Sequence, residues 1–235
     1  MKLGGLQKHT LIDFPGNIAC TVFTVGCNFK CPFCHNPELV IPSSTTMEEG
    51  NIDTKKFFEF LKTRKGLLDG VVITGGEPCI QPDLVEFCIK IKAMGFKIKL
   101  DTNGTMPHTL ELLFRDKLVD YVAMDIKSSP AQYFAAAGTK FNLDLIPKSI
   151  KLIMDNAPDY EFRTTCVKSL INEKIVKDIG KMINNAKLYI LQPCTRSTDV
   201  LNPEFIKKQD GFFSKKELSY LKDIVENYVD KCELR

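Results

Sequence analysis

The sequence predicts an α/β protein in which six parallel strands form a partial (β/α)6 barrel. Two observations lead to this prediction. Short apolar, β-branched segments alternate with segments of helical periodicity, and successive strand-like segments lie roughly 20 to 50 residues apart. Such alternation is typical of βα units repeated around a parallel sheet. Right-handed crossovers of this kind give either a barrel or an open doubly wound sheet. Six units are fewer than the eight of a closed barrel, so a curved, incomplete barrel is the preferred form.

The individual elements can be assigned in chain order. The predicted strands share an apolar or β-branched core, and they lie at residues 18–25, 71–74, 96–100, 121–124, 160–167 and 187–191. The predicted helices between them share apolar residues spaced three or four apart, and they lie at 53–62, 82–94, 108–115, 130–137, 147–156 and 173–184. Asp53 or Thr54 is a plausible cap of the first helix, and Gly95 is a typical residue after a helix end. Pro147 suits the first position of its helix.

The chain of 235 residues fits a single domain. We assign residues 1–235 to it, with an N-terminal extension at about 1–17 and a C-terminal helix at about 214–231. Ser214 is a plausible N-cap of that helix, because Glu217 three residues later completes the pattern of a capping box. The composition, 44% hydrophobic and 26% charged, is that of an ordinary globular protein.

Charge and apolar patterning exclude several classes of protein. The net charge of +3 comes from 32 basic and 29 acidic residues, which gives no case for nucleic-acid binding. No apolar run approaches the roughly 20 residues that span a bilayer, so we expect no membrane partner. Residues 1–6 are too short and too quickly polar for a signal peptide. Nine cysteines without an export signal indicate a reducing compartment, so we expect a cytoplasmic protein without a disulfide framework.

Polar and glycine-rich clusters follow four consecutive predicted strands. A cysteine-rich segment at 26–36 follows the first strand, and Gly-Gly-Glu-Pro at 75–78 follows the second. Asp-Thr-Asn-Gly at 101–104 follows the third strand, and Asp-Ile-Lys at 125–127 ends the fourth. Ligands of parallel α/β folds bind at the carboxyl edge of the sheet, so the four clusters predict one composite site.

Three cysteines of the first cluster form a candidate metal centre. Cys27, Cys31 and Cys34 lie within eight residues and offer three thiolate ligands, where a closed structural site would use four. A four-iron cluster held by three thiolates leaves one iron open to an exogenous ligand. Zinc would need a fourth ligand; the adjacent His35 is poorly placed for this, and Cys20 or Cys79 could also serve. A thioredoxin-like redox pair would use only the last two cysteines and leave the first unexplained.

The cysteine spacing, with Phe33 directly before the last cysteine and Gly-Gly-Glu-Pro downstream, resembles the radical S-adenosylmethionine (SAM) superfamily over essentially the whole chain. The resemblance implies a barrel of the radical-SAM type and a [4Fe–4S] cluster on Cys27, Cys31 and Cys34. It also implies that the amino and carboxylate groups of SAM chelate the open iron. Residues 35–70 contain no cysteine, so we expect one cluster and no inserted ferredoxin-like domain.

Further residues are then expected to contact SAM. The Phe33 ring can pack on the adenine, or its backbone can hydrogen-bond the adenine edge; a plain core aromatic is the alternative. Gly75 and Gly76 allow close backbone approach to the ligand, although a simple turn would use the same glycines. Glu77 is expected to accept a hydrogen bond from the ammonium group of SAM.

A closer resemblance links the chain to the activating enzymes of glycyl radical enzymes. It rests on the His-Asn pair at 35–36, on Asp-Thr-Asn-Gly at 101–104 and on Asp-Ile-Lys at 125–127. It implies a monovalent cation near Asp101 and Asp125, beside the SAM carboxylate, and a contact of Lys127 with that carboxylate. A solvated salt bridge at the rim is the alternative for these charges. The resemblance also implies that Thr102, Asn103 and Arg163 belong to the cofactor-binding site.

The implied reaction is the one-electron cleavage of SAM to methionine and a 5′-deoxyadenosyl radical, which abstracts hydrogen from a backbone glycine of a partner enzyme. The segment 4–16 resembles anaerobic ribonucleoside-triphosphate reductase activating proteins, so that reductase is the expected partner. A flavodoxin or ferredoxin is the expected low-potential electron donor.

One alternative function is that of a radical SAM enzyme acting on a small molecule, similar to 7-carboxy-7-deazaguanine synthase. Another is a non-catalytic iron–sulfur or zinc protein.

Two features leave questions open. Many activating enzymes carry a histidine near the end of the sixth strand, whereas this chain has Gln-Pro-Cys-Thr at 192–195, so the ribose contact is not assigned. Cys79 and Cys194 lie near predicted strand ends, and we expect both to be packed side chains, because free cysteine is commonly buried.

Overall fold

The computed structural model describes residues 1–41, 52–195, 200–208 and 211–235. Its centre is one eight-stranded sheet in which the strands follow one another in sequence order. The strands are β1 (Leu3–Thr10), β2 (Ala19–Thr24), β3 (Gly70–Gly75), β4 (Lys97–Thr102), β5 (Tyr121–Asp125), β6 (Tyr160–Cys166), β7 (Tyr189–Pro193) and β8 (Cys232–Leu234). Strand β1 runs antiparallel to β2, and every later neighbour pair is parallel.

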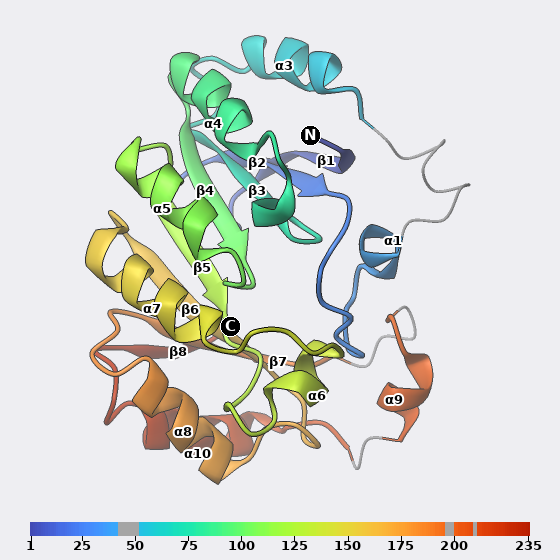
Figure 1. Cartoon of the computed structure of the whole chain (residues 1–235), viewed down its shortest axis with the longest axis vertical. Coiled ribbons are helices and arrows are strands. Elements are labelled where there is room, and N and C mark those ends of the chain that lie inside the picture. The colour runs from blue at the N-terminus through green and yellow to red at the C-terminus, as the bar shows by residue number, and fades with distance from the viewer. Residues whose placement is uncertain (42–51, 196–199, 209–210) are drawn as a thin grey trace.

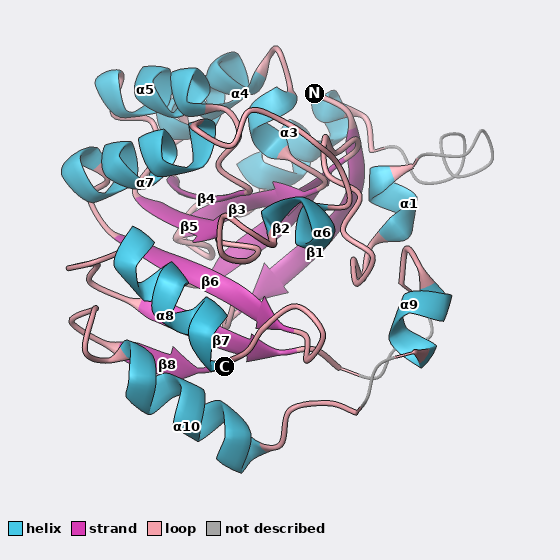
Figure 2. Cartoon of the chain, turned by 60° about the horizontal axis from the view of Figure 1, so that its bottom comes forward, coloured by secondary structure: helices cyan, strands magenta, loops and turns pink. Residues whose placement is uncertain are grey.

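Helices cover the outer face of this sheet (Figures 1 and 2). The longer ones are α3 (Thr54–Lys62), α4 (Leu84–Ala93), α5 (Pro107–Arg115), α7 (Leu145–Asn156), α8 (Glu173–Met182) and α10 (Lys215–Val225). Short helices lie toward the carboxyl ends of the strands: α1 (Pro37–Val40), α6 (Tyr133–Ala137), α9 (Pro203–Lys207) and the 3-10 helix η1 (Pro78–Ile80). None of the described helices is long and apolar enough to cross a membrane.

The strand order identifies the sheet as a partial barrel. An open doubly wound sheet reverses its strand order at one point, whereas β2 to β7 are consecutive parallel neighbours joined by crossover helices. Within the described residues β1 and β8 do not pair with each other, so the sheet does not close. The predicted partial (β/α)6 barrel is therefore confirmed, with one added strand at each edge.

Most predicted elements are present, and the differences have local causes. The six predicted strands correspond to β2–β7. The prediction that Pro147 begins its helix is wrong, because α7 starts at Leu145. Proline is still tolerated there, since the first-turn amides of a helix have no intrahelical partner. Strand β1 was not predicted, because it is a half-exposed edge strand with two glycines and no apolar run. The C-terminal helix predicted at about 214–231 is shorter, because α10 ends at Val225 and the three-residue strand β8 begins at Cys232.

The barrel interior is apolar at the amino ends of the strands. Phe14, in the loop between β1 and β2, is 2% exposed and belongs to a small interior cluster. Its ring lies 6.2 Å from that of Tyr121, between centroids. A Cβ on Gly70 would lie 2.8 Å from the Phe14 ring, so glycine is what allows the ring to sit there. The loop thus seals the end of the barrel opposite to the carboxyl edge.

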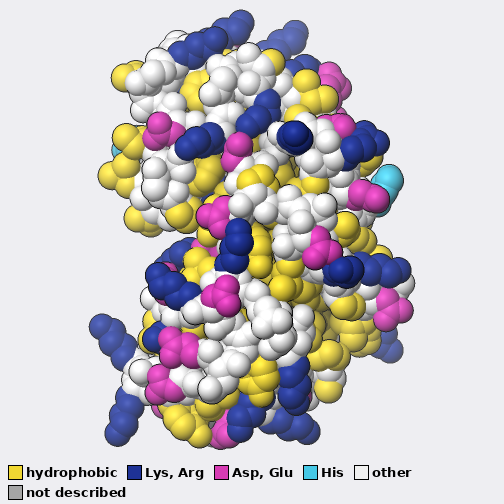
Figure 3. Space-filling view, turned by 90° about the vertical axis from the view of Figure 1, so that its left-hand side faces the viewer, with side chains coloured by type: hydrophobic (Ala, Val, Ile, Leu, Met, Phe, Trp, Pro, Cys, Tyr) yellow, Lys and Arg dark blue, Asp and Glu magenta, His cyan; other side chains and the backbone are white. Residues whose placement is uncertain are grey.

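Further along the strands the interior becomes charged. Glu161 on β6 is fully buried and accepts hydrogen bonds of 2.9 Å from both terminal nitrogens of Arg235. The hydroxyl of Tyr121 donates to the same carboxylate over 3.1 Å. Lys99 on β4 is only 2% exposed. On the outer face drawn in Figure 3, by contrast, basic and acidic side chains are interspersed on the surface.

Candidate active site

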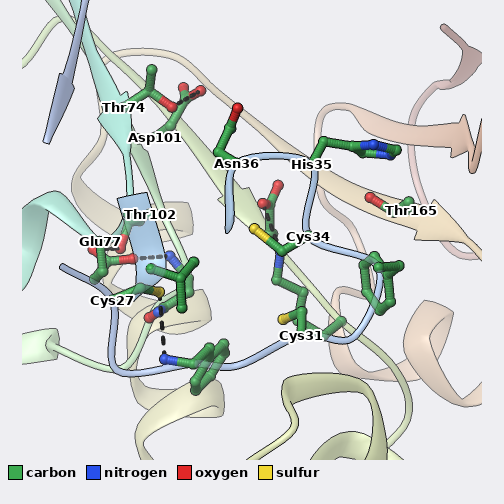
Figure 4. Close-up of a pocket in the computed structure, with 18 of the residues that line it drawn as sticks. Cys27, Cys31, Cys34, His35, Asn36, Thr74, Glu77, Asp101, Thr102 and Thr165 are labelled. Atoms are coloured by element: carbon green, nitrogen blue, oxygen red, sulfur yellow. Dashed lines mark hydrogen bonds and ion pairs between the residues drawn. The ribbon is translucent and has the colours of Figure 1, made fainter. Parts of the chain in front are cut away.

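A cavity of about 220 Å³ lies at the carboxyl edge of the sheet (Figure 4). All thirteen residues assigned to the site from the sequence line it: Cys27, Cys31, Phe33, Cys34, Gly75, Gly76, Glu77, Asp101, Thr102, Asn103, Asp125, Lys127 and Arg163. The remaining lining residues were not assigned a contact: Phe29, His35, Asn36, Val40, Thr74 and Thr165. The four clusters that follow β2, β3, β4 and β5 therefore do meet in one place.

Distant segments hold the cysteine loop in position. The backbone amide of Lys30 donates to the carbonyl of Ala137 at the end of α6, over 2.8 Å. On the other side, the amide of Leu201 donates to the carbonyl of Cys34 over 2.9 Å, and that of Asn202 to Pro32 over 3.0 Å. The loop therefore has backbone partners on two sides, which limits how its cysteines can move.

The three thiols face a common space in Figure 4. Cys31 is buried, whereas Cys27 and Cys34 are partly exposed. Burial raises the pKa of the Cys27 thiol to about 12 and that of Cys31 to about 11, so metal binding must displace protons from them. Within the described residues no three metal-binding side chains converge on a single ion. Three soft donors around a cavity fit an iron–sulfur cluster with one iron free of protein ligands.

Of the two glycines of Gly-Gly-Glu-Pro, Gly76 packs against the cysteine loop and Gly75 packs against β2. A Cβ on Gly76 would lie 2.0 Å from the carbonyl oxygen of Gly26. Gly75 has φ +109°, and a Cβ there would lie 2.4 Å from the amide nitrogen of Thr24. The amide of Glu77 donates to the same Gly26 carbonyl over 2.9 Å. This close packing explains both glycines, and their contact with a ligand stays a prediction.

Glu77 joins two of the clusters. It is 1% exposed, and its carboxylate accepts from the amide of Cys79 over 2.9 Å, from the hydroxyl of Thr102 over 2.9 Å and from the amide of Asn103 over 2.6 Å. Burial raises the pKa of Glu77 despite these hydrogen bonds. The Cys79 thiol also hydrogen-bonds this carboxylate, which lines the cavity.

Asn28, which the sequence analysis overlooked, ties the cysteine loop to the segment 101–104. Its amide oxygen accepts from Asn103 Nδ2 over 2.8 Å, and its own Nδ2 donates to Thr105 Oγ1 over 2.7 Å. An asparagine between two cysteines gives little signal in a sequence, because such residues are common in loops.

The charged residues form a continuous network. The guanidinium of Arg163 lies between two carboxylates, 2.8 Å from Asp125 and 3.2 Å from Asp101. Lys127 lies 3.0 Å from Asp125, and Lys99 lies 2.6 Å from Asp101. Side-chain exposures of 2–29% contradict the alternative of a solvated rim salt bridge.

The pKa values of both aspartates reflect this network. Burial by itself would raise the pKa of Asp101, but Arg163 and Lys99 outweigh it, so the pKa is lowered. Burial acts against ionisation of Asp125 in the same way, and Arg163 with Lys127 lowers its pKa well below the usual range. Both carboxylates are therefore ionised and already paired, an arrangement that does not fit the expected monovalent cation.

The remaining expectations concern cysteines and the ribose contact. Cys79 and Cys194 are 2% and 5% exposed, lie in the main core cluster and do not line the cavity, as expected of packed side chains.

Gln192 lines a second interior cavity rather than this one. Thr165, two residues after Arg163 on β6, lines the site instead, and alternation along the strand was the signal that could have identified it.

Sequence comparisons with known proteins bear on the family to which this chain belongs. The sequence model of the radical SAM superfamily matches residues 21–175. A Methanocaldococcus jannaschii protein, provisionally named as a glycyl-radical enzyme activating enzyme, is 32% identical over 99% of this chain and 95% of its own length. The pyruvate formate-lyase-activating enzyme of Listeria monocytogenes is 33% identical over 62% of this chain and 60% of its own.

A solved structure supports the fold. Streptococcus suis SuiB superposes with a TM-score of 0.67 at 15% sequence identity, covering 92% of this chain and 48% of that protein. Identity this low shows a common fold and nothing finer.

Proposed function

The chain belongs to the radical SAM superfamily and is an enzyme, and from that premise we propose that it installs a glycyl radical on a partner enzyme. One observation carries the proposal: the cysteine loop meets Glu77, Asp101, Asp125 and Lys127 in one cavity at the carboxyl edge of the sheet. Similarity over nearly the whole length to a protein named as an activating enzyme adds support.

Cys27, Cys31 and Cys34 would hold the [4Fe–4S] cluster in this proposal. When bound, the cluster supplies the electron that cleaves SAM to methionine and the 5′-deoxyadenosyl radical. The protein positions the reactants and excludes side reactions. The backbone bonds of Lys30 and Cys34 to distant segments would keep the three ligands in place while the loop is loaded.

The other cavity residues would bind SAM by complementary charge. The buried carboxyl group of Glu77, which lines the cavity, suits the ammonium group of SAM, and Lys127 with Arg163 suits its carboxylate. Phe33 is 3% exposed and lines the same cavity, where it can pack against the adenine. We do not include a monovalent cation, because protein cations already engage both aspartates.

A glycine loop of a partner needs a path into the barrel. A second interior cavity of about 520 Å³ shares Thr74, Asp101 and Arg163 with the site and extends to Gln7 on β1 and Gln192 on β7. In the part of the chain that the structure describes, β1 and β8 do not pair with each other, which leaves the barrel open between these two strands. These features support entry of an extended peptide. Because of the N-terminal resemblance at 4–16, we propose anaerobic ribonucleoside-triphosphate reductase as the partner, with flavodoxin or ferredoxin as electron donor.

The enzymatic part of the proposal is tested by anaerobic reconstitution with iron and sulfide, followed by reduction in the presence of SAM. The expected product is 5′-deoxyadenosine. If an intact cluster yields none, the proposal that this chain cleaves SAM is wrong.

The partner is tested by electron paramagnetic resonance. The reduced enzyme is incubated with SAM and either anaerobic ribonucleotide reductase or pyruvate formate-lyase. We expect a glycyl radical signal in the reductase and none in a reductase variant whose acceptor glycine is replaced by alanine. A signal in pyruvate formate-lyase alone would assign a different partner. Production of 5′-deoxyadenosine without a radical in either protein would favour a small-molecule substrate.

A further inference from the structure

The two aspartates of the site have no carboxylate oxygen left without a protein cation. Lys99 Nζ lies 2.6 Å from Asp101 Oδ1, and Arg163 Nη1 lies 3.2 Å from Asp101 Oδ2. Arg163 Nε lies 2.8 Å from Asp125 Oδ1, and Lys127 Nζ lies 3.0 Å from Asp125 Oδ2. An alkali cation binds through oxygen ligands, and these four oxygens are already engaged in charge-assisted hydrogen bonds.

Lys99 is the unusual member of this network. It lies on β4 two residues before Asp101, so both side chains point into the barrel. At 2% exposure its ammonium group is removed from water, which is costly unless the charge is paired. Its partners are the Asp101 carboxylate and the ring of Tyr121, whose centroid is 5.9 Å away. A buried lysine held in this way is a fixed cation beside the site.

The charge balance of the network disfavours another cation. Lys99, Arg163 and Lys127 carry three positive charges against the two carboxylates, which leaves one positive charge in excess. Glu161 pairs with Arg235 and also lies 3.9 Å from Arg163, so these two residues add one charge of each sign and leave the excess unchanged. A further cation would meet repulsion, whereas a ligand carboxylate would neutralise the excess.

We propose that Lys99, together with Arg163, takes the place of an exchangeable monovalent cation at Asp101 and Asp125, so that SAM binding does not depend on potassium or sodium. Lys99 is then a positioning residue: it holds Asp101, which holds Arg163 in the orientation that faces the ligand carboxylate. The identity of the ligand, SAM, rests on the proposed function. The inference that no exchangeable cation occupies the site does not.

The first test uses the wild-type enzyme. The reconstituted protein is exchanged into tetramethylammonium, sodium or potassium salts of equal ionic strength, and SAM affinity is measured by equilibrium dialysis. We expect the dissociation constant to change by less than about twofold between salts, since only general screening differs. A severalfold, saturable tightening by potassium over tetramethylammonium would overturn the proposal.

A second test locates the cation directly, in crystals grown with SAM and in crystals grown without it. Crystals of the reconstituted enzyme are soaked in thallous salt, and the anomalous signal is mapped. Absence of a peak beside Asp101 and Asp125 is expected, and a peak there would overturn the proposal. If SAM fails to bind in every salt, the proposed function is wrong, while the thallium map still decides whether the cation site exists.

The third test compares Lys99→Met with Lys97→Met, which removes an exposed lysine from the same strand. We expect Lys99→Met to bind SAM about tenfold more weakly in tetramethylammonium, because a buried carboxylate loses its partner. Potassium is expected to restore part of that affinity, whereas Lys97→Met should behave as wild type in all salts. Unchanged affinity in Lys99→Met would overturn the positioning role. If Lys99→Met does not fold, the wild-type tests decide.

Discussion

Cys31 is the most buried of the three proposed cluster ligands, at 7% exposure, and it lies in the middle of the loop. We predict that Cys31→Ala loses most of its iron and sulfide after reconstitution. Loss of even an indirect partner of a metal ligand weakens metal binding by about 10- to 100-fold, and loss of a ligand should cost at least as much. Iron and sulfide analysis together with the visible absorption spectrum measures the effect.

Cys88→Ala is the matched control for this substitution. Cys88 is fully buried in α4 and does not line the cavity, so its loss tests the effect of removing any buried thiol. The control should load a full cluster. A stable, fully loaded four-iron cluster in Cys31→Ala would remove that residue from the ligand set.

Gly76→Ala adds one atom, the Cβ, where the segment after β3 packs against the cysteine loop. The added Cβ would lie 2.0 Å from the carbonyl oxygen of Gly26, and backbone cannot move aside as a flexible side chain would. We predict a loss of about 3 kcal/mol or more in the free energy of unfolding, at the upper end for overpacking. Denaturant titration of the metal-free protein measures it.

Gly95→Ala separates this clash from simple backbone strain. Gly95 follows α4 with φ +91°, and nothing lies within 4 Å of its Cβ position. Its substitution should cost only about 1–2 kcal/mol, the penalty of a left-handed conformation. Equal losses at both positions would show that the Gly26 contact is not what requires Gly76.

At the scale of single elements, α10 begins with a complete capping box. Ser214 Oγ accepts from the amide of Glu217 over 3.2 Å, and the Glu217 carboxylate accepts from the amide of Ser214 over 2.7 Å. We predict that Ser214→Ala lowers the free energy of unfolding by about 1 kcal/mol, because a first-turn amide loses its partner. Ser219→Ala, at an exposed position inside the same helix, should be neutral or slightly stabilising. A larger loss at Ser219 than at Ser214 would contradict the capping role.

Elements with strong local signals were predictable, and those stabilised mainly by their neighbours were not. The capping box at Ser214 and the glycine after α4 are both present as expected, since each depends on residues close in sequence. Strand β1 depends on pairing with β2, which no pattern within residues 3–10 indicates. Strand β8 similarly extends the sheet beside β7 with three residues.

The same distinction holds for the site. Every predicted site residue lines the cavity, because each motif follows a strand and parallel strands end at one edge. The pairing of those residues was not predictable. Arg163 lies 38 and 62 positions from its two aspartate partners, and only the curvature of the barrel brings β4, β5 and β6 close enough for one guanidinium to contact both.

At the scale of the whole molecule, the barrel has an apolar amino end and a polar carboxyl end, and Phe14 is central to the apolar one. Its ring packs among Ala19, Val72, Tyr121 and Ala123 at 2% exposure. We predict that Phe14→Ala lowers the free energy of unfolding by about 3 to 5 kcal/mol, as large aromatic truncations in cores do. Denaturant titration of the metal-free protein measures the loss.

Ile12→Ala is the matched control in the same loop, since Ile12 is 81% exposed and its loss should change stability by less than about 0.5 kcal/mol. Because Phe14 contacts the amino ends of the strands and the cysteines follow the carboxyl end of β2, folded Phe14→Ala protein should still load iron as the wild type does. Poor loading in a variant that is folded by circular dichroism would mean that the two ends are coupled through the charged interior. Full stability in Phe14→Ala would instead show that the loop does not seal the barrel.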